Sequence, residues 1–222
     1  MLNDSFELLT TLKNAGFLRV LRDPLWWPKS GSYEVVVGAI LTQQTKWEKV
    51  EKSLKNLKDN GINSLEEISS LDIRALSTLI KPSGFYNTKA KYLLGVSKNI
   101  IKDFGSFDEF CITADRDWLL AQRGIGKESA DSILCYGCLK DFFVVDNYTM
   151  RLLSALGFTF ESYDEVQEWM SGGILSNRDK IDKLYQKKMS VNEIFARFHG
   201  KIVEYCKENS KGRTVFTERL RV

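Results

Sequence analysis

The sequence predicts an all-α fold, and three observations lead to this prediction. Ser/Thr-x-x-Glu pairs recur before apolar segments with helical spacing, and each pair can bond the backbone N–H groups that the start of a helix leaves without partners. Evidence for strands is thin. Prolines, which interrupt helices, stand only between candidate helices, at Pro24, Pro28 and Pro82. The pairs are Thr45 with Glu48, Ser64 with Glu67, Ser106 with Glu109, Ser162 with Glu165 and Ser190 with Glu193.

The predicted elements follow from apolar spacing along the chain. Tyr33–Leu41 is an apolar pattern that is better explained by a buried helix than by a strand. Leu119–Leu134 contains two apolar helical segments interrupted by Gly124–Gly126. Phe142–Val145 is too short to start a sheet without partner strands, and the helical pattern Tyr148–Leu156 follows it.

Length and composition allow one globular unit or two small lobes. The 222 residues are 43% hydrophobic and 27% charged, and a net charge of +3 is too small to prove a nucleic-acid partner. No apolar run reaches the length of a membrane span, and Met-Leu-Asn-Asp-Ser does not resemble the start of a signal peptide. We therefore expect a cytoplasmic protein with no membrane partner.

The four cysteines do not resemble a secreted disulfide framework. Cys135 and Cys138 have the spacing of metal ligands, but no second Cys or His pair accompanies them. Buried thiols are therefore favoured over a zinc site, and we predict no metal.

The turn Gly124-Ile125-Gly126 has two interpretations. Gly124 can end one helix in a left-handed conformation, and Gly126 can leave bare N–H groups where the next helix begins, which is the geometry of an anion site. Arg123 and Lys127 add positive charge on either side, so a phosphate-binding helix-hairpin-helix is one interpretation. The other is a tight corner between two helices with glycine caps.

Several separated segments resemble one family. LLAQRGIGKESADSILCYG, followed by FFVVDNYTMRLL, is similar to the helix-hairpin-helix glycosylase superfamily, which includes endonuclease III and the adenine and alkylpurine DNA glycosylases. LTQQT at 41–45, PSGFYNTKAKYL at 82–93 and FHGKIVEYC at 198–206 extend the resemblance in the right order. With Trp-Trp-Pro near the start, the chain resembles in particular the 3-methyladenine DNA glycosylase III type.

The resemblance implies a two-lobed all-α fold with an active-site cleft between the lobes. Residues 29–135 would form a helical lobe that ends in the helix-hairpin-helix. Residues 1–28 and 136–222 would form the second lobe, and double-stranded DNA would be the partner of a monomeric enzyme.

Asp146 is the candidate catalytic residue. The apolar run before it would seat it against the core, and donors at the start of the following helix would keep it ionised. A glycosylase flips a nucleotide out of the duplex, and positive charge then develops on the sugar, where a carboxylate stabilises it. The alternative is a plain helix N-cap. The resemblance places the family's catalytic aspartate at this position.

Aromatic residues are the candidates for binding the flipped base. Trp26, Trp27 and Pro28 form one loop, and Trp47 follows the QQT segment. Flat aromatic faces would stack a base and favour a cationic one, such as an N-alkylated purine. Core packing is the alternative for each tryptophan.

Two residues are DNA-contact candidates by resemblance. Gln43 corresponds to the glutamine that fills the gap left by the flipped base, and Phe85 corresponds to an apolar wedge between bases. The alternatives are a helix-terminal glutamine and a loop phenylalanine that closes the core. The predicted DNA contacts are thus Gln43, Phe85, Arg123, Gly124, Gly126 and Lys127.

The chain departs from its relatives at two places, and His199 and Lys201 raise separate questions. Bifunctional relatives carry a lysine nucleophile where this chain has Glu128, so we predict a monofunctional enzyme without lyase activity. Many relatives hold an iron–sulfur cluster with four C-terminal cysteines, whereas only Cys206 follows residue 190, so we predict no cluster. His199 is expected to be structural, and Lys201, if buried, needs a carboxylate partner or loss of its charge.

The leading hypothesis is a cofactor-free DNA glycosylase that excises alkylated purines, chiefly 3-methyladenine. One alternative is excision of mismatched adenine or of oxidised bases. The other is a helix-hairpin-helix DNA-binding protein without enzymatic activity, which would not need a carboxylate just past the hairpin.

Overall fold

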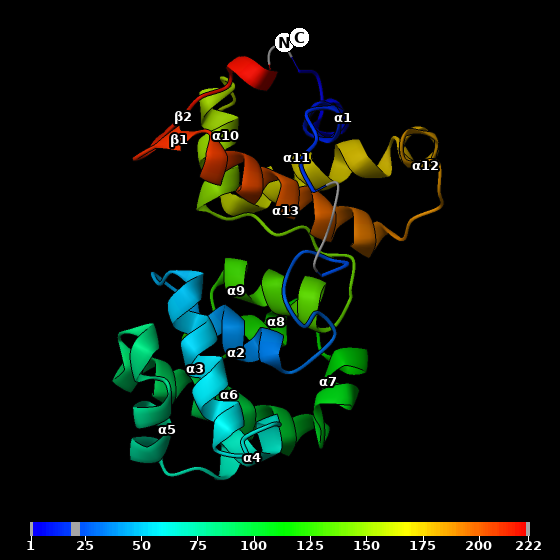
Figure 1. Cartoon of the computed structure of the whole chain (residues 1–222). Coiled ribbons are helices and arrows are strands. Elements are labelled where there is room, and N and C mark those ends of the chain that lie inside the picture. The colour runs from blue at the N-terminus through cyan, green and yellow to red at the C-terminus, as the bar shows by residue number, and fades with distance from the viewer. Residues whose placement is uncertain (1, 19–22, 221–222) are drawn as a thin grey trace. The chain divides into compact units, whose positions relative to one another are not determined.

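The computed structural model describes residues 2–18 and 23–220. Helices dominate these residues, as predicted (Figure 1). The chain divides into two compact units: Met1–Pro28 with Lys140–Val222 forms unit 1, and Lys29–Leu139 forms unit 2. None of the described helices is long and apolar enough to cross a membrane.

Unit 2 is built around two helices of different character. Every residue from Val35 to Leu41 of α2 is buried, which explains why this helix is apolar on all sides. The long helix α6 is amphipathic, and its buried face packs against α2, α4, α5 and α7. The elements are α2 (Glu34–Leu41), α3 (Trp47–Asp59), α4 (Leu65–Ser70), α5 (Ile73–Leu79), η1 (Lys81–Ser83), α6 (Tyr86–Phe104), α7 (Phe107–Thr113), α8 (Arg116–Leu120), α9 (Lys127–Ser132) and the π-helical turn η2 (Ile133–Gly137).

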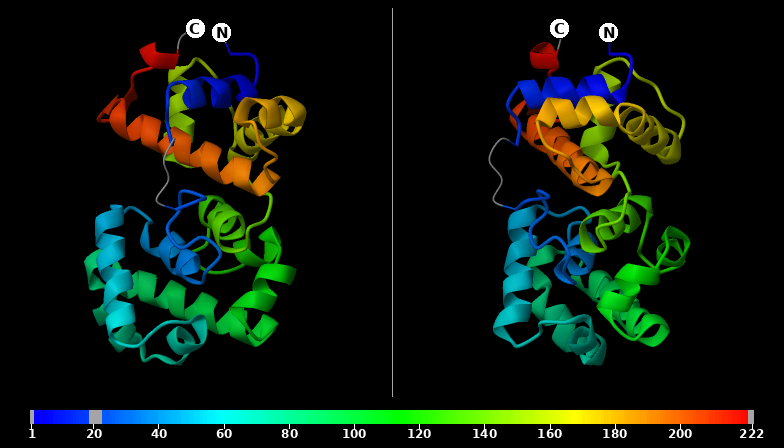
Figure 2. Two further views of the ribbon diagram at one scale, coloured as in Figure 1. Left: turned by 45° about the vertical axis from the view of Figure 1, so that its right-hand side comes forward. Right: turned by 90° about the vertical axis from the view of Figure 1, so that its right-hand side faces the viewer.

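Unit 1 joins the two ends of the chain in one core. The N-terminal α1 packs against α11 and α13, and both further views show it among the C-terminal helices of its unit (Figure 2). Leu8, Leu12, Phe143 and Phe198 lie in this core. The elements are α1 (Ser5–Asn14), α10 (Asn147–Ala155), α11 (Tyr163–Leu175), α12 (Arg178–Tyr185), α13 (Val191–Glu208), β1 (Ser210–Lys211), β2 (Thr214–Val215) and η3 (Glu218–Leu220).

Four of the five expected capping pairs are confirmed. The hydroxyls of Ser64, Ser106, Ser162 and Ser190 each accept a hydrogen bond from the N–H of the glutamate three residues later. The prediction for Thr45 is wrong. Lys46 precedes α3 without a side-chain cap, because the Thr45 hydroxyl donates instead to the carbonyl of Ser83, at 2.6 Å.

The sequence did not predict the short antiparallel hairpin β1–β2. Arg151 of α10 holds its turn: Nε donates to the carbonyl of Arg213 at 2.9 Å and Nη2 to that of Gly212 at 2.8 Å. The Tyr205 hydroxyl donates to the carbonyl of Phe216 at 2.7 Å. The side chains of Arg151 and Tyr205 thus hold the C-terminal segment by donating hydrogen bonds to its backbone carbonyls.

Candidate active site and hairpin

Asp146 stands where an extended buried segment turns into α10. Its backbone is extended, with φ −115° and ψ −178°, so the side chain reaches forward over the first turn of the helix. Oδ1 accepts two hydrogen bonds from Thr149, one from the backbone N–H at 2.8 Å and one from the hydroxyl at 3.0 Å. Asp146 is therefore the N-cap of α10, which was one of the two roles predicted for it from the sequence. An N-cap aspartate is also a carboxylate that is held ionised.

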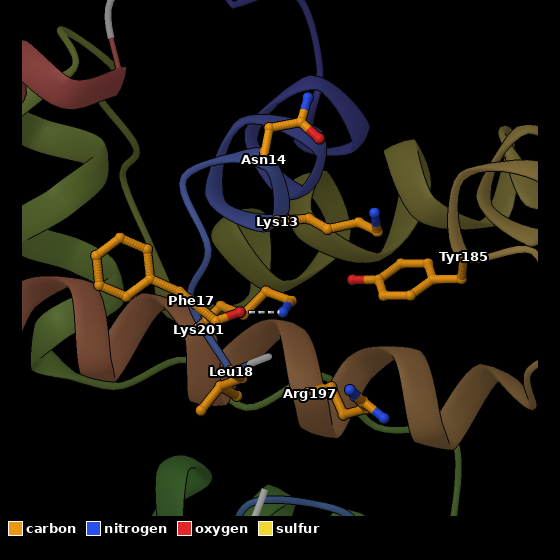
Figure 3. Close-up of a pocket in the computed structure, with 7 residues that line it drawn as sticks. All are labelled: Lys13, Asn14, Phe17, Leu18, Tyr185, Arg197 and Lys201. Carbon is orange, nitrogen blue, oxygen red and sulfur yellow. Dashed lines mark hydrogen bonds between the residues drawn. The ribbon is translucent and has the colours of Figure 1, made fainter. Parts of the chain in front are cut away.

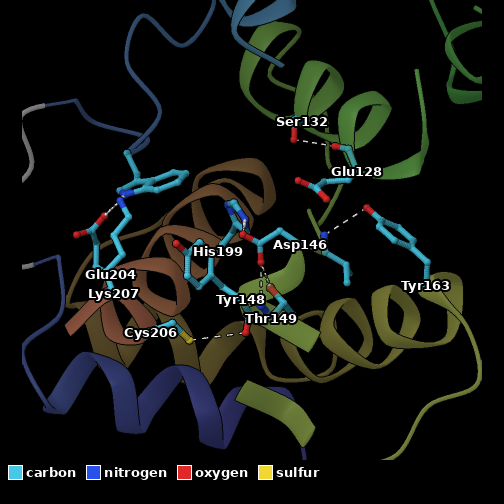
Figure 4. Close-up of polar contacts among 12 residues, drawn as sticks. Glu128, Ser132, Asp146, Tyr148, Thr149, Tyr163, His199, Glu204, Cys206 and Lys207 are labelled. Atoms are coloured by element: carbon cyan, nitrogen blue, oxygen red, sulfur yellow. Dashed lines mark hydrogen bonds and ion pairs between the residues drawn. The ribbon is translucent and has the colours of Figure 1, made fainter. Parts of the chain in front are cut away.

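The second oxygen of Asp146 faces His199 of α13. His199 Nε2 lies 3.4 Å from Oδ2, and 13% of the Asp146 side chain remains exposed (Figure 4). Burial raises the pKa of Asp146, but the interaction with His199 and the two hydrogen bonds from Thr149 outweigh burial and lower this pKa below its usual value. The site thus holds an ionised carboxylate at the edge of solvent.

The segment that carries Asp146 is fixed from behind by α11. The Val145 N–H donates to the hydroxyl of Tyr163 at 3.2 Å, and Gln167 Nε2 donates to the carbonyl of Phe143 at 2.7 Å. These side-chain hydrogen bonds replace the backbone hydrogen bonds that an extended segment would form with neighbouring strands in a sheet. Asp146 is therefore anchored on both sides.

Trp26 lies beside His199 in unit 1. Their rings meet edge to face, with centroids 5.2 Å apart at 87°. A Cβ on Gly200 would come within 2.5 Å of the Trp26 ring, so this glycine lets the indole lie directly on α13. Glu204 accepts from Trp26 Nε1 at 3.0 Å and fixes the orientation of the ring.

The predicted base-binding residues fall in both units. Trp26, Trp27 and Pro28 share one loop of unit 1, where Trp27 is 8% exposed and stands at 83° to Trp26. Trp47 is the first residue of α3 in unit 2 and is half-buried. The structure thus places Trp26 beside His199, the neighbour of Asp146, and it assigns Trp47 to the other unit.

The hairpin between α8 and α9 has the glycine geometry that the sequence predicted. Gly124 has φ +87°, and a Cβ there would lie 2.2 Å from Tyr92, so neither the backbone nor the space admits another residue. Ile125 is buried as an anchor, at 6% exposed. Gly126 caps α9, and a Cβ there would meet nothing within 4 Å, so the cap faces open space. Arg123 and Lys127 are exposed on either side.

A buried ion pair locks the hairpin. Asp131 of α9 is completely buried, and Arg116 of α8 grips both of its oxygens, with Nε at 2.8 Å and Nη2 at 3.1 Å. A bidentate guanidinium is the geometry in which a buried carboxylate is best compensated. The two helices of the hairpin are therefore held together independently of apolar contacts.

Gln43 and Phe85 lie in two turns of unit 2. Gln43 Nε2 donates to the carbonyl of Gly124 at 2.8 Å and to the hydroxyl of Ser129 at 3.2 Å, so it contacts the hairpin. Phe85 has φ +46° and is 69% exposed. This exposure excludes the interpretation that Phe85 closes the core. A large apolar side chain held in solvent with a left-handed backbone is typical of a contact residue.

Lys201 is buried, as the sequence suggested it could be, and its amine bonds to a backbone carbonyl. Nζ donates to the carbonyl of Phe17, and burial together with Arg197 and Lys13 lowers the Lys201 pKa to about 8. These cations line a cavity of about 360 Å³ with Tyr185 (Figure 3). The described residues that line this cavity include no carboxylate, so a carboxylate partner for Lys201 is not found among them.

His199 could not be predicted as a neighbour of Asp146, because a single histidine within a helix has no spacing that indicates such a contact. Cys135 is buried in the π-helical turn, and Cys138, just after it, is half-buried. Within the part of the chain that the structure describes, no group of three or more His, Cys, Asp or Glu could hold a metal ion.

Comparison with known proteins agrees with this geometry. Residues 37–173 match the model of the HhH-GPD superfamily of base excision DNA repair proteins. The chain belongs to this superfamily. Its matched segment includes both Gly124–Gly126 and Asp146, so the hairpin and the candidate catalytic carboxylate both lie within the shared part of this DNA glycosylase.

Two similar proteins and one more distant structure agree with the superfamily assignment. The crystal structure of a 3-methyladenine DNA glycosylase from Helicobacter pylori, bound to 1,N6-ethenoadenine, is 45% identical, covers 94% of this chain and 99% of its own, and has a TM-score of 0.89. A protein of Methanocaldococcus jannaschii named as a candidate DNA repair glycosylase is 41% identical over 82% of this chain and 80% of its own length. Endonuclease III trapped on DNA shares the fold, at 18% identity over 97% of this chain and 91% of its own, with a TM-score of 0.67.

Proposed function

We propose that this HhH-GPD glycosylase excises alkylated purines, chiefly 3-methyladenine, from double-stranded DNA and leaves the abasic site intact. It acts as a monomer, without an iron–sulfur cluster. The observation that carries the proposal is Asp146, a carboxylate held ionised by Thr149 and His199 while part of it still faces solvent.

The chemistry follows from the charge on this carboxylate. When the N-glycosidic bond breaks, its electron pair leaves with the purine and positive charge develops on the sugar. Asp146 stabilises that charge and orients the water molecule that attacks C1′. The proton that this water loses passes to solvent or to the released base. Thr149 occupies Oδ1, which leaves Oδ2, next to His199, to face the sugar.

The aromatic loop supports an electron-poor base as substrate. Trp26 and Pro28 are half-buried and can offer apolar surfaces to a base, and the buried Trp27 and the half-buried Trp47 are kept as predicted further contacts. An N-alkylated purine carries positive charge or is electron-poor, so it stacks well on indole and is already a good leaving group. Such a substrate needs no strong general acid, and the residues around Asp146 offer an imidazole and hydroxyls in place of a second carboxylate.

Glu128 supports a monofunctional enzyme. A Schiff base requires an amine nucleophile, and a carboxylate cannot supply one. Lys127 is one residue away, and one residue turns a helix by about 100°, which directs its side chain elsewhere. In this proposal Gln43 and Phe85 enter the duplex, while Arg123, Lys127 and the N–H groups at Gly124 and Gly126 bind phosphate.

The C-terminal residues do not fit an iron–sulfur cluster. A four-thiolate cluster needs four cysteines, and only Cys206 follows residue 190. Its Sγ lies 3.6 Å from the carbonyl of Tyr148, where the thiol serves as a weak donor inside unit 1. Arg151 and the β1–β2 hairpin occupy this part of the fold.

The direct test is release of free bases from methylated duplex DNA, resolved by chromatography. We expect 3-methyladenine to be released faster than 7-methylguanine and the Asp146→Asn variant to release neither. Release of mismatched adenine or of oxidised bases, with alkylated purines retained, would overturn the substrate assignment.

The absence of lyase activity is tested on DNA that already contains an abasic site. We expect an unbroken strand after incubation with the enzyme and no protein–DNA adduct after borohydride reduction. A trapped adduct would contradict the monofunctional assignment. Its loss in the Lys127→Met variant would identify Lys127 as the nucleophile, and its persistence would indicate another amine.

A further inference from the structure

Lys89, in the first turn of α6, is a buried cation whose three donors are all used. Only 3% of the residue is exposed. Nζ donates to the carbonyl of Leu41 at 2.8 Å, to the hydroxyl of Thr45 at 2.7 Å and to the carbonyl of Ser83 at 2.9 Å. An ammonium has three N–H donors, so one side chain satisfies three acceptors from two separate turns.

These acceptors belong to the two turns that carry Gln43 and Phe85. Leu41 and Thr45 stand on either side of Gln43, and Ser83 comes two residues before Phe85. The Thr45 hydroxyl also donates to the carbonyl of Ser83 at 2.6 Å, which closes a triangle with Lys89. The turns that carry Gln43, the proposed gap-filling residue, and Phe85, the proposed wedge, are therefore both hydrogen-bonded to the Lys89 amine.

The lysine desolvates a charge to join the two turns, which an apolar side chain would not do. Burial lowers the pKa of Lys89 to about 8, so the charged form is disfavoured at this position. Its partners are dipoles, and a buried cation held by dipoles alone is compensated less fully than one paired with a carboxylate. A methionine would fill a similar volume without a desolvation penalty, but it would not join the two turns.

We propose that Lys89 is a positioning residue that fixes Gln43 and Phe85 relative to each other, so that both enter the duplex together. This inference rests on the proposed function. When Gln43 and Phe85 are held at a fixed separation, the entry of one side chain into the duplex already places the other. The second contact then costs no further conformational entropy. Lys89 acts through these two side chains and does not itself contact DNA.

The test compares Lys89→Met with Lys98→Met in the full chain. Lys98 is an exposed lysine of the same helix, nine residues on and hence on the opposite side, so its removal changes net charge by the same amount. Affinity for a duplex with a tetrahydrofuran abasic analogue is measured by fluorescence anisotropy. Unstacking is followed with 2-aminopurine beside the lesion, and single-turnover base release is measured with saturating enzyme.

For Lys89→Met we expect affinity and the 2-aminopurine signal to fall by about 10-fold or more, as misplaced contacts do. The urea midpoint of Lys89→Met should fall, because the carbonyls of Leu41 and Ser83 and the hydroxyl of Thr45 lose their shared donor. Lys98→Met should behave as the wild type. In a Gln43→Ala/Phe85→Ala background, adding Lys89→Met should cost less than twofold. An equal loss in both backgrounds, or no loss in either, would overturn the inference.

Two further measurements keep the test decisive. If Lys89→Met does not fold, Thr45→Val retains the lysine and removes the hydroxyl that joins both turns; we expect the same pattern, and wild-type DNA binding would contradict it. If the wild type binds the abasic duplex but releases no alkylated purine, the substrate assignment fails. The affinity comparison then still decides the role of Lys89.

Discussion

Two aspartates, one in each unit, are held in different ways. Asp131 in the hairpin of unit 2 is completely buried, and Arg116 binds both of its oxygens. Asp146 at the start of α10 in unit 1 has both Thr149 bonds on Oδ1, while Oδ2 lies 3.4 Å from His199 and the side chain is 13% exposed. Both oxygens of Asp131 are bound by the Arg116 guanidinium, whereas Oδ2 of Asp146 is left for the proposed contact with a reacting group.

The difference separates a structural carboxylate from a chemical one. A bidentate guanidinium fully compensates the charge of Asp131, which then holds two helices together. Asp146 keeps its charge through a backbone N–H, a hydroxyl and an imidazole, which leave its field directed outward. Burial alone therefore does not distinguish the two aspartates, whereas the partners of each oxygen do, and these partners support the proposed catalytic role of Asp146.

The largest expected effect distinguishes the two aspartates by activity. Asp146→Asn should lower single-turnover base release by about 10²- to 10³-fold, because electrostatic stabilisation of the sugar is lost. Affinity for abasic-analogue DNA and the thermal midpoint should stay close to those of the wild type, since asparagine also caps helices. Base release by Asp146→Asn at the wild-type rate would contradict the assignment.

The second effect is on stability and concerns the other aspartate. Arg116→Met should lower the free energy of unfolding by about 3 kcal/mol, because Asp131 would remain buried without its partner. Urea unfolding measures the loss, and the double variant Arg116→Met/Asp131→Leu should recover most of it. At low temperature, where Arg116→Met is folded, base release at saturating enzyme should stay within a few fold of the wild type.

A third effect separates binding from chemistry within unit 2. Phe85 is 69% exposed, so Phe85→Ala should change the unfolding free energy by less than about 0.5 kcal/mol. Affinity for abasic-analogue duplex should nevertheless fall by about 10-fold, because the apolar wedge is lost. Phe216→Ala, at an exposed phenylalanine of unit 1, is the matched control. Equal losses of affinity in both variants would mean that Phe85 has no special role.

The smallest effect concerns pH. Thr149→Val removes the hydroxyl donor from Asp146, so the pKa of Asp146 rises and the acid limb of the pH–rate profile moves to higher pH. Because the folded pKa is depressed, this bond stabilises the fold above the unfolded pKa, and its contribution is lost as pH falls through the folded pKa. The variant should be less stable by about 1 kcal/mol near neutral pH and equal to the wild type in strong acid. An unshifted acid limb would show that Asp146 does not govern it.

Much of the fold was predictable because its signals are local. The serine caps, the all-apolar α2 and the left-handed Gly124 each follow from a few neighbouring residues. Thr45 was mispredicted because a tertiary bond to Ser83 replaced the local cap. The β1–β2 hairpin was missed because its strands have two residues each and are held by Arg151 from a distant helix.

The site was predictable in part for the same reason. Asp146 followed from its place between an apolar run and a helix and from the family resemblance. His199 beside it, and Lys89 between two turns, depend on contacts between residues far apart in the sequence. One histidine or lysine within a helix carries no periodic signal of such a contact. Only the folded chain shows these neighbours.

The most direct test of the central claim uses a cationic mimic of the breaking sugar. Duplexes that contain a pyrrolidine abasic analogue, positively charged at the sugar ring, are compared with neutral tetrahydrofuran duplexes in binding to the wild type and to Asp146→Asn. We predict that the wild type binds the cationic duplex about 100-fold or more tightly than the neutral one and that Asp146→Asn loses this preference. A preference that survives the substitution unchanged would contradict the claim that Asp146 stabilises the positive sugar.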